Sequence, residues 1–513
     1  MSSRRPPAAG TLLCRRKGRH RRSRSHIFLL MTANRQSRSA PNDRELRLWK
    51  VGRTLTLAFA AAVLVSAGVF LSLVVLLDFQ EIDKTAKLDA KTLFDLVKLS
   101  FGVVAGAGAL VALVVAYRRQ RVDEAGAHRE ATRLHTERFS QAVDKLGSDS
   151  PAVRLGGVHA LAGLADDAPD DSLRQTCIDV LCAYLRLPFP PDPGNPPDDT
   201  AAEEQREAHQ DKKDRYRALR EVRHTILRLI GDHYRTPKGT HHSWQGCNLD
   251  LTGVAIDGQM SFTGASFSGG DVSFTDAAFS GGNVSFTDAA FSGGNVSFTD
   301  AIFSGGNVSF TDAAFSGGNV SFTDAIFSGG NVSFTDAAFS GGNVHFDGAT
   351  FSDGYVVSFV GATFSGSYVS FVEARFTGGD VRFTGATFSG GDLHFDNATF
   401  SGGDVHFTGA TFSGGNVHFD HAIFCGSYVR VILAIFSGGN VSFTHAAFSG
   451  GDVRFDHAIF EGSMVPFTGA VFSGGNVHFD ATSGPAPAGL LEAVGTPAPA
   501  EVRLRPDWLP ANP

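Results

Sequence analysis

Hydrophobic residues along the chain follow three patterns, and each pattern predicts a different kind of structure. Two uncharged runs, at 54–77 and 99–117, have no polar side that could face water. From 118 to about 240, apolar residues recur at steps of three and four, the spacing of amphipathic helices. From Phe262 to Phe479 the recurring hydrophobic residue is Phe, in alternating steps of five and seven. The sequence therefore predicts a mixed fold with two transmembrane helices, an α-helical part and a long repetitive part.

The two uncharged runs are long enough to cross a bilayer as a helical hairpin, at 54–117. At 1.5 Å per residue they would measure about 36 Å and about 28 Å, against a hydrocarbon core of about 30 Å. Arg and Lys flank the hairpin on both outer sides, whereas the loop 78–98 holds five acids and four Lys. The positive-inside rule then predicts a multi-pass protein of the cell membrane, with the N-terminus and the repeats in the cytoplasm. Small residues in both runs offer packing faces, within the hairpin or between copies in a homo-oligomer.

The leader at 1–53 carries fifteen Arg or Lys against two acids. Such a segment cannot bury a core and is predicted to be disordered. We favour a solvated basic tail beside a membrane over a nucleic-acid-binding arm. Translation from Met31 instead of Met1 would remove most of this basic stretch.

The middle of the chain predicts three helices around a Pro-rich linker. A helical hairpin is expected at 118–186, where Ser150 before Pro151 is a start signal and Gly156 and Gly157 imply close packing. The linker spans 187–199, and an amphipathic helix follows at 200–240. Between Arg118 and Lys238, twenty basic and twenty-one acidic residues nearly cancel, which gives no support to a nucleic-acid surface.

The repeat unit is twelve residues long, as in 284–295, and recurs about eighteen times. Val284 and Phe286 are two residues apart, as are Ala289 and Phe291, so in a strand both members of each pair point to one side and the residue between them points to the other. Each half-unit therefore predicts a short strand with a buried Phe. The Ser-Gly-Gly-Asn segment that follows predicts a turn, since Gly and Asn tolerate positive φ. The repeat slips by one residue at 354–359, and Val431 replaces one Phe. The predicted core begins with Phe262, Phe267, Phe274, Phe279, Phe286, Phe291, Phe298 and Phe303.

One coil could contain either 24 or twelve residues. A coil of twelve would have two sides and would press two Phe across a very thin interior. A coil of 24 would have four sides around a stacked Phe core at ordinary density, so we favour it.

The pentad small-x-Phe-Ser/Thr-x, which the segment 247–251 and Val254 lead into, resembles the pentapeptide-repeat family. The resemblance implies a right-handed four-sided β-helix, here at 245–480, although the steps alternate between five and seven instead of remaining at five. The stretch 139–187, above all 154–161, is similar to the cytoplasmic helical segment of bacterial membrane proteins that end in such repeats. The Pro/Ala-rich tail at 481–513 either caps the last coil, through Gly489–Val494, Leu504, Trp508 and Leu509, or is disordered.

Residues 262–480 carry nineteen acids and four Arg, a net charge of −15. Acids recur at Asp276, Asp288, Asp300, Asp312, Asp324 and Asp336, which predicts two vertical rows of carboxylate along the surface. Solubility is the simpler reason for this charge, and an acidic interaction face is the alternative. Direct nucleic-acid binding is not expected, because the rod would repel phosphates.

Two pairs of His stand one 24-residue coil apart: His394 with His418, and His421 with His445. Stacked imidazoles could ligate a metal, but no carboxylate to support them is evident in the pattern, so we expect no metal. We also find no phosphate-binding loop, no nucleophile elbow and no paired buried carboxylates, and therefore predict no enzyme and no cofactor.

The sequence thus predicts a non-catalytic, membrane-anchored repeat scaffold that binds an unknown protein partner. The alternative is an acidic DNA mimic that regulates a DNA-binding protein such as a topoisomerase. That alternative follows from the resemblance, because some acidic pentapeptide-repeat rods bind DNA gyrase.

Overall fold

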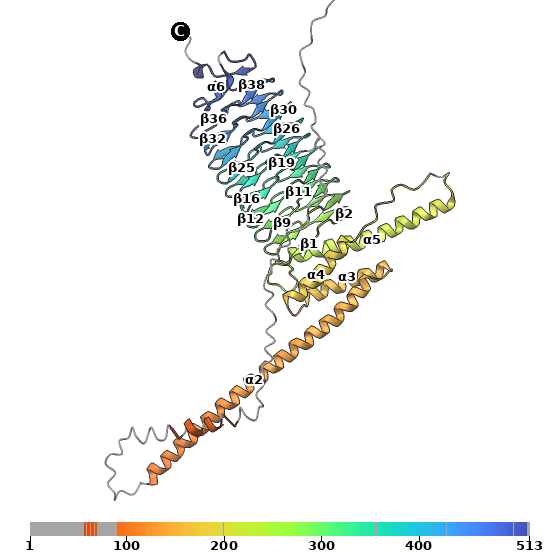
Figure 1. Ribbon diagram of the computed structural model, residues 1–513, viewed down its shortest axis with the longest axis vertical. Coiled ribbons are helices and arrows are strands. Elements are labelled where there is room, and N and C mark those ends of the chain that lie inside the picture. Colours follow the sequence, from red (N-terminus) through yellow and green to blue (C-terminus); the bar gives the residue numbers. More distant parts are fainter. Residues whose placement is uncertain are drawn as a thin grey trace, which may run out of the picture. The chain divides into compact units, whose positions relative to one another are not determined.

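The computed structural model describes residues 90–509 except 199, 353–355, 427 and 496, together with 56–57, 59–61, 63–65 and 67–68 (Figure 1). Contacts divide the chain into two units, Met1–Asp123 and Glu124–Pro513. The predicted disordered leader at 1–53 and most of the run 54–77 lie outside the described residues.

The prediction of two transmembrane helices is wrong. In the part of the chain that the structure describes, no helix is both long enough and apolar enough to cross a membrane. The run 99–117 lies inside a single helix, α2 (Ala90–Leu146), whose remaining length is rich in charge. Nine of the nineteen residues in this run are Gly, Ala or Ser, which bury little apolar surface. The assignment to the cell membrane depended on these helices and is wrong as well.

The second unit begins with a packed group of helices. The end of α2 packs on α3 (Pro151–Asp166) and α4 (Asp171–Arg186), and α5 (Glu203–Arg235) follows the linker. Close packing is confirmed at Gly157, where a Cβ would lie 2.6 Å from the backbone N of Leu146, but not at Gly156, where nothing lies within 4 Å of an added Cβ. Cys177 and Cys182 lie in this core, and burial raises their pKa to about 11 and about 12.

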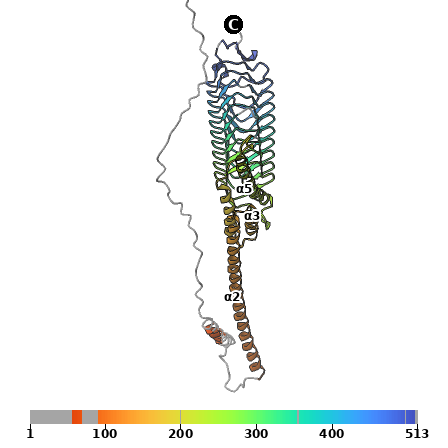
Figure 2. The same ribbon diagram turned by 90° about the vertical axis from the view of Figure 1, so that its right-hand side faces the viewer.

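The remainder is a right-handed β-solenoid of very short strands, seen as a stack of coils in Figure 2. The first coil contributes β1 (Leu249–Asp250), β2 (Ala255–Asp257), β3 (Met260–Ser261) and β4 (Ser266–Phe267), each to a different parallel sheet. We name these sheets A, B, C and D in that order. The succession continues to β38 (Val477–His478) and β39 (Val502–Arg503) in sheet C.

The register settles the coil length. Val272 pairs with Val296, so one coil contains 24 residues, and the twelve-residue alternative is wrong. The predicted one-residue slip is confirmed, because Val332 pairs with Val357, one residue further on than the usual spacing.

Phe rings fill the interior as four columns. Within a column the rings are parallel, as for Phe286 and Phe310, whose centroids lie 4.9 Å apart with planes at 2°. The eight Phe named as the start of the core are at most 2% exposed. Each buried ring stabilises the fold by up to about 3 kcal/mol. Val431 takes the place of one ring and is buried as well.

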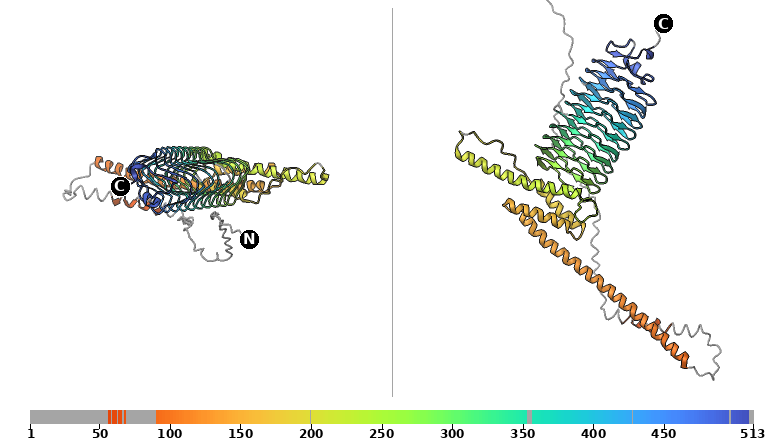
Figure 3. Two further views of the ribbon diagram at one scale, coloured as in Figure 1. Left: turned by 90° about the horizontal axis from the view of Figure 1, so that it is seen from above. Right: turned by 180° about the vertical axis from the view of Figure 1, so that it is seen from behind.

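Both ends of the solenoid are covered, which protects the open edges of its sheets. At the first coil, α5 lies across the end of the solenoid (Figure 3) and contacts β3 and β4. The Tyr234 ring lies 5.3 Å from the Phe267 ring. At the last coil, the short helix α6 (Leu490–Val494) contacts β37 (Val471–Phe472), and Trp508 lies 6.0 Å from Phe479.

A partly buried carboxylate ties α3 to α5 and to the loop that leads into the first coil. Asp166, at the end of α3, accepts hydrogen bonds from Trp244 Nε1 at 2.9 Å and from His242 Nδ1 at 3.0 Å, and it pairs with His233. Burial alone would raise the pKa of Asp166, but these three partners outweigh it and lower the pKa. Burial likewise would lower the pKa of His233, and the contact with Asp166 raises it instead.

Most of the glycine pairs at the turns contain a Gly at positive φ, as predicted, for example Gly318 at 61° and Gly342 at 73°. The pair 293–294 is an exception that has another reason. Gly293 and Gly294 do not adopt positive φ; a Cβ on Gly294 would instead lie 1.7 Å from the carbonyl oxygen of Gly270 in the preceding coil. Positive φ also recurs at the other kind of corner, where Asp288 has φ 57°. The Gly-Gly turn at 293–294 is therefore set by the close stacking of backbones.

Candidate functional site

The predicted acidic residues form two separate rows and not one face. Asp276, Asp300 and Asp324 lie at the corner between sheets A and B, whereas Asp288, Asp312 and Asp336 lie at the corner between sheets C and D. These two corners are diagonally opposite. All six residues have φ between 54° and 57°.

The charges within one row lie close enough to affect one another. The pKa of Asp300 is raised by its partial burial and by the neighbouring carboxylates Asp324 and Asp276. Gly348 and Gly361 succeed Asp324 and Asp336 in the next coil, so both rows of Asp end near the middle of the rod.

The N-terminal half of sheets A and C presents hydroxyls that bond mainly to one another. On sheet C, Thr263 Oγ1 lies 2.8 Å from Ser285 Oγ, which donates to Thr287 Oγ1 at 3.2 Å. The same alternation repeats through the next coils. Because these hydroxyls satisfy one another, this half of the rod offers few free polar groups to a ligand.

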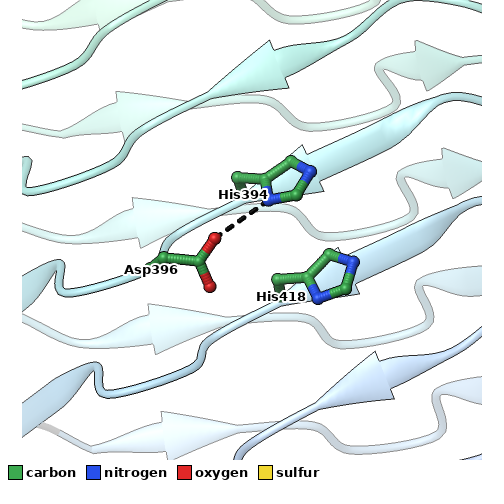
Figure 4. Close-up of side chains that lie close together, drawn as sticks. All are labelled: His394, Asp396 and His418. Carbon is green, nitrogen blue, oxygen red and sulfur yellow. Dashed lines mark hydrogen bonds and ion pairs between the residues drawn. The ribbon is translucent and has the colours of Figure 1, made fainter.

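In the C-terminal half of sheet A, His replaces Ser at several outward positions, and an Asp follows two residues later. Strand β25 (Asp392–His394) pairs with β29 (Asn416–His418), with His394 directly beside His418. The two imidazoles stack at 4.5 Å with planes at 10°. His394 Nδ1 donates a hydrogen bond to Asp396 Oδ2 at 2.9 Å (Figure 4).

Asp396 is the carboxylate beside His394 that the sequence analysis missed. The period of two along a strand places residues 394 and 396 on the same outward side, and this signal was available in the sequence. His345 with Asp347 and His418 with Asp420 repeat the arrangement, with Nδ1 to carboxylate distances of 3.5 Å and 3.8 Å.

In two of these pairs the second carboxylate oxygen is held by a Ser of the next coil. Asp347 Oδ1 accepts from Ser370 Oγ, and Asp420 Oδ1 accepts from Ser442 Oγ. Burial alone would raise the pKa of Asp347, but the hydrogen bonds from His345 and Ser370 outweigh it and lower the pKa. These Ser hydroxyls therefore help to fix the orientation of the two carboxylates.

In the third pair this donor is absent. Asp396 Oδ1 is buried and has no hydrogen-bond partner among the described residues. The next coil places His418 at the position that Ser370 and Ser442 fill in the other pairs. The orphaned oxygen is therefore a direct consequence of the second His in the column.

We expect His418→Ser to stabilise the protein by about 1 kcal/mol, because the new hydroxyl would donate to Asp396 Oδ1. The measurement is the free energy of unfolding of the solenoid in urea. The matched control is Ser370→Ala, which removes the hydroxyl donor to Asp347 Oδ1 and leaves it only the Val372 N–H at 3.2 Å, and should destabilise by about 1 kcal/mol. A lower stability for His418→Ser would mean that the stacked imidazoles outweigh the missing hydrogen bond.

The group His394, Asp396 and His418 has ligand atoms within 4.8 Å of one another, the right kind of set for a divalent cation. Its geometry does not fit one. Nitrogen lone pairs lie in the ring planes, and the two rings are parallel, so the lone pairs run side by side instead of converging. In addition, His394 Nδ1 is already engaged with Asp396.

A second such group lies on sheet C and comprises Asp380, Asp404 and His406. Its two carboxylates already form ion pairs with guanidinium groups: Arg382 lies 2.8 Å from Asp380, and Arg430 lies 2.7 Å from Asp404. Burial and the adjacent Arg430 lower the pKa of His406. The other predicted pair, His421 and His445, stacks at 5.0 Å on the corner between sheets A and B.

A second departure from the repeat lies around Val431, and the sequence analysis did not identify the exposed apolar residues that accompany it. Ile423, Tyr428, Leu433 and Ile435 are exposed there, and Leu433 is 57% exposed. Leu433 adopts φ 57° at the corner between sheets C and D, where the preceding coils have Asp or Gly. The replacement of Phe by Val431 was the signal that marked this coil as unusual.

Comparison with known proteins agrees with the repeat geometry. Residues 354–394 match the family model described as pentapeptide repeats (9 copies). No curated protein and no solved structure matches the chain. The strands within the match run from β19 (Val357–Ser358) of sheet C to β25 of sheet A. The repetitive part of this chain is a right-handed β-solenoid, and its residues 354–394 match the model of the pentapeptide-repeat family.

Proposed function

We propose that the β-solenoid is a non-catalytic scaffold whose C-terminal half binds a protein partner. The observation that carries the proposal is Leu433. A left-handed conformation is unfavourable for Leu by about 1–2 kcal/mol, and this side chain is exposed, so it gains little from the fold in return. Exposed strain of this kind is typical of residues that serve binding.

The neighbouring residues support a binding surface at this coil. Tyr428 is 46% exposed and lies under the Arg430 guanidinium at 5.6 Å, and Ile435 stands on the adjoining sheet D. Tyr and Arg beside exposed aliphatic side chains are the composition typical of protein interface centres. The uniform N-terminal half has no comparable mixture among its described residues.

The test is a photo-crosslinking residue placed at position 433 of the full chain, and at position 302 as a control. Ile302 is similarly exposed, at 42%, but lies in the uniform half. We expect a discrete crosslinked protein at 433 and none at 302. Leu433→Asp restores the residue type of Asp288 at this corner and should reduce recovery of that protein at least about tenfold without loss of stability. Equal crosslinking at both positions would contradict the proposal.

The alternative function, an acidic DNA mimic, is supported by the net charge of −15 over residues 262–480, to which the two rows of Asp contribute. These rows lie on diagonally opposite corners and end at Asp324 and Asp336, so they do not form one continuous acidic face. Unchanged gyrase supercoiling at low salt in the presence of the full chain would exclude this function.

A further inference from the structure

The helices before the solenoid enclose a groove that the scaffold function does not use. It lies between the end of α2, helices α3 and α4, the start of the linker and the middle of α5, and its volume is about 520 Å³. Leu146, Val180 and Leu219 contribute to its largely apolar wall. We call it the helical groove. Its volume falls in the range of about 300–1,000 Å³ that is usual for small-molecule sites.

Three Arg line the helical groove, and no Asp or Glu does. Arg223 is 6% exposed, donates to the carbonyl oxygen of Ala255 at 2.8 Å and lies 4.8 Å from the Phe189 ring. Arg154 donates to the carbonyl oxygen of Ser148.

Arg223 is charged but lacks a counterion. Among the described residues it has no carboxylate partner, and burial lowers its pKa. A buried guanidinium has five N–H donors and remains protonated in proteins, so an unpaired one is costly to the fold. An anion that entered the groove would relieve this cost and would form charge-assisted hydrogen bonds.

We propose that the helical groove binds a small amphiphile with one anionic headgroup, held by Arg223, and an unbranched apolar body along Leu146, Val180 and Leu219. Carboxylates and phosphate monoesters share the required head chemistry, because both accept paired hydrogen bonds from a guanidinium. Because Arg223 also bonds to Ala255 in the first coil, the bound ligand lies at the junction between the helices and the solenoid.

The test is isothermal titration of the full chain with decanoate and with decyl phosphate, which distinguishes the two headgroups. Decanol provides the same body without charge, and butyrate provides the head without the long body. We expect at least one of the two anionic decyl compounds to bind, and decanol and butyrate each to bind at least about tenfold more weakly. Equal binding of decanol, or no binding of either anion, would overturn the proposal.

Two variants locate the ligand. Arg223→Met should weaken binding roughly 10- to 100-fold, the usual effect of removing a charged hydrogen-bond donor. Val180→Trp fills the groove but leaves Arg223 in place, and it should abolish binding even if Arg223→Met fails to fold. Val153→Trp, on the exposed side of α3, is the matched control and should bind normally. Unchanged binding in Val180→Trp would place the ligand elsewhere and refute the assignment.

Discussion

Gly294→Ala is expected to destabilise the solenoid by about 3 kcal/mol or more. The added Cβ would lie 1.7 Å from the carbonyl oxygen of Gly270 and 2.7 Å from its carbon. Both contacts are with backbone atoms, which cannot move away without opening the hydrogen bonds between the two coils. The measurement is the shift of the urea midpoint of the full chain, followed by far-ultraviolet circular dichroism.

The matched control is Gly264→Ala. Gly264 has φ 68° and nothing within 4 Å of the added Cβ, so only backbone strain of about 1–2 kcal/mol should appear. Equal effects of the two substitutions would show that conformation, and not the close approach of successive coils, explains the glycine turns.

Phe322→Ala is expected to cost about 3–5 kcal/mol, the usual loss for a buried aromatic residue. Phe322 is fully buried in its column, 4.9 Å from Phe298 and 4.7 Å from Phe346. Because each coil contacts only its neighbours, hydrogen exchange should accelerate first in the coils beside Phe322. Denaturation gives the magnitude of the loss, and hydrogen exchange gives its location.

Ser316→Ala serves as the control for Phe322→Ala, because Ser316 is exposed and faces outward. It should change the free energy of unfolding by less than about 0.5 kcal/mol. A loss below about 1 kcal/mol for Phe322→Ala would indicate that the stacked rings contribute little to the rod.

The strict repeat made the core of the solenoid predictable. A Phe at steps of five and seven, each two residues after a small apolar residue, already defines which side chains point inward. Packing density then selected the coil of 24 residues, which the register confirms. Length and absence of charge did not suffice for 99–117, because that run is the interior of a longer, partly charged helix.

The candidate site was less predictable, because it depends on contacts between coils. The pairing of His394 with Asp396 could have been predicted, because residues two apart on a strand point to the same side. The missing hydrogen-bond partner of Asp396 Oδ1 could not, because it depends on which residue the next coil places beside it. The strained backbone at the exposed Leu433 results from the positive φ of its corner, and this φ cannot be read from the repeat sequence.

By itself, the sequence determined the interior of this protein: a regular alternation of small residues and Phe can bury its rings in only one way, and that way is a stacked coil. The tertiary structure alone decided the surface. It separated the six Asp into two opposite edges, set Gly294 against the backbone of the previous coil and gathered three Arg around one apolar groove. The physical reason is that burial follows from the character of each residue, whereas a surface site requires residues distant in sequence to meet.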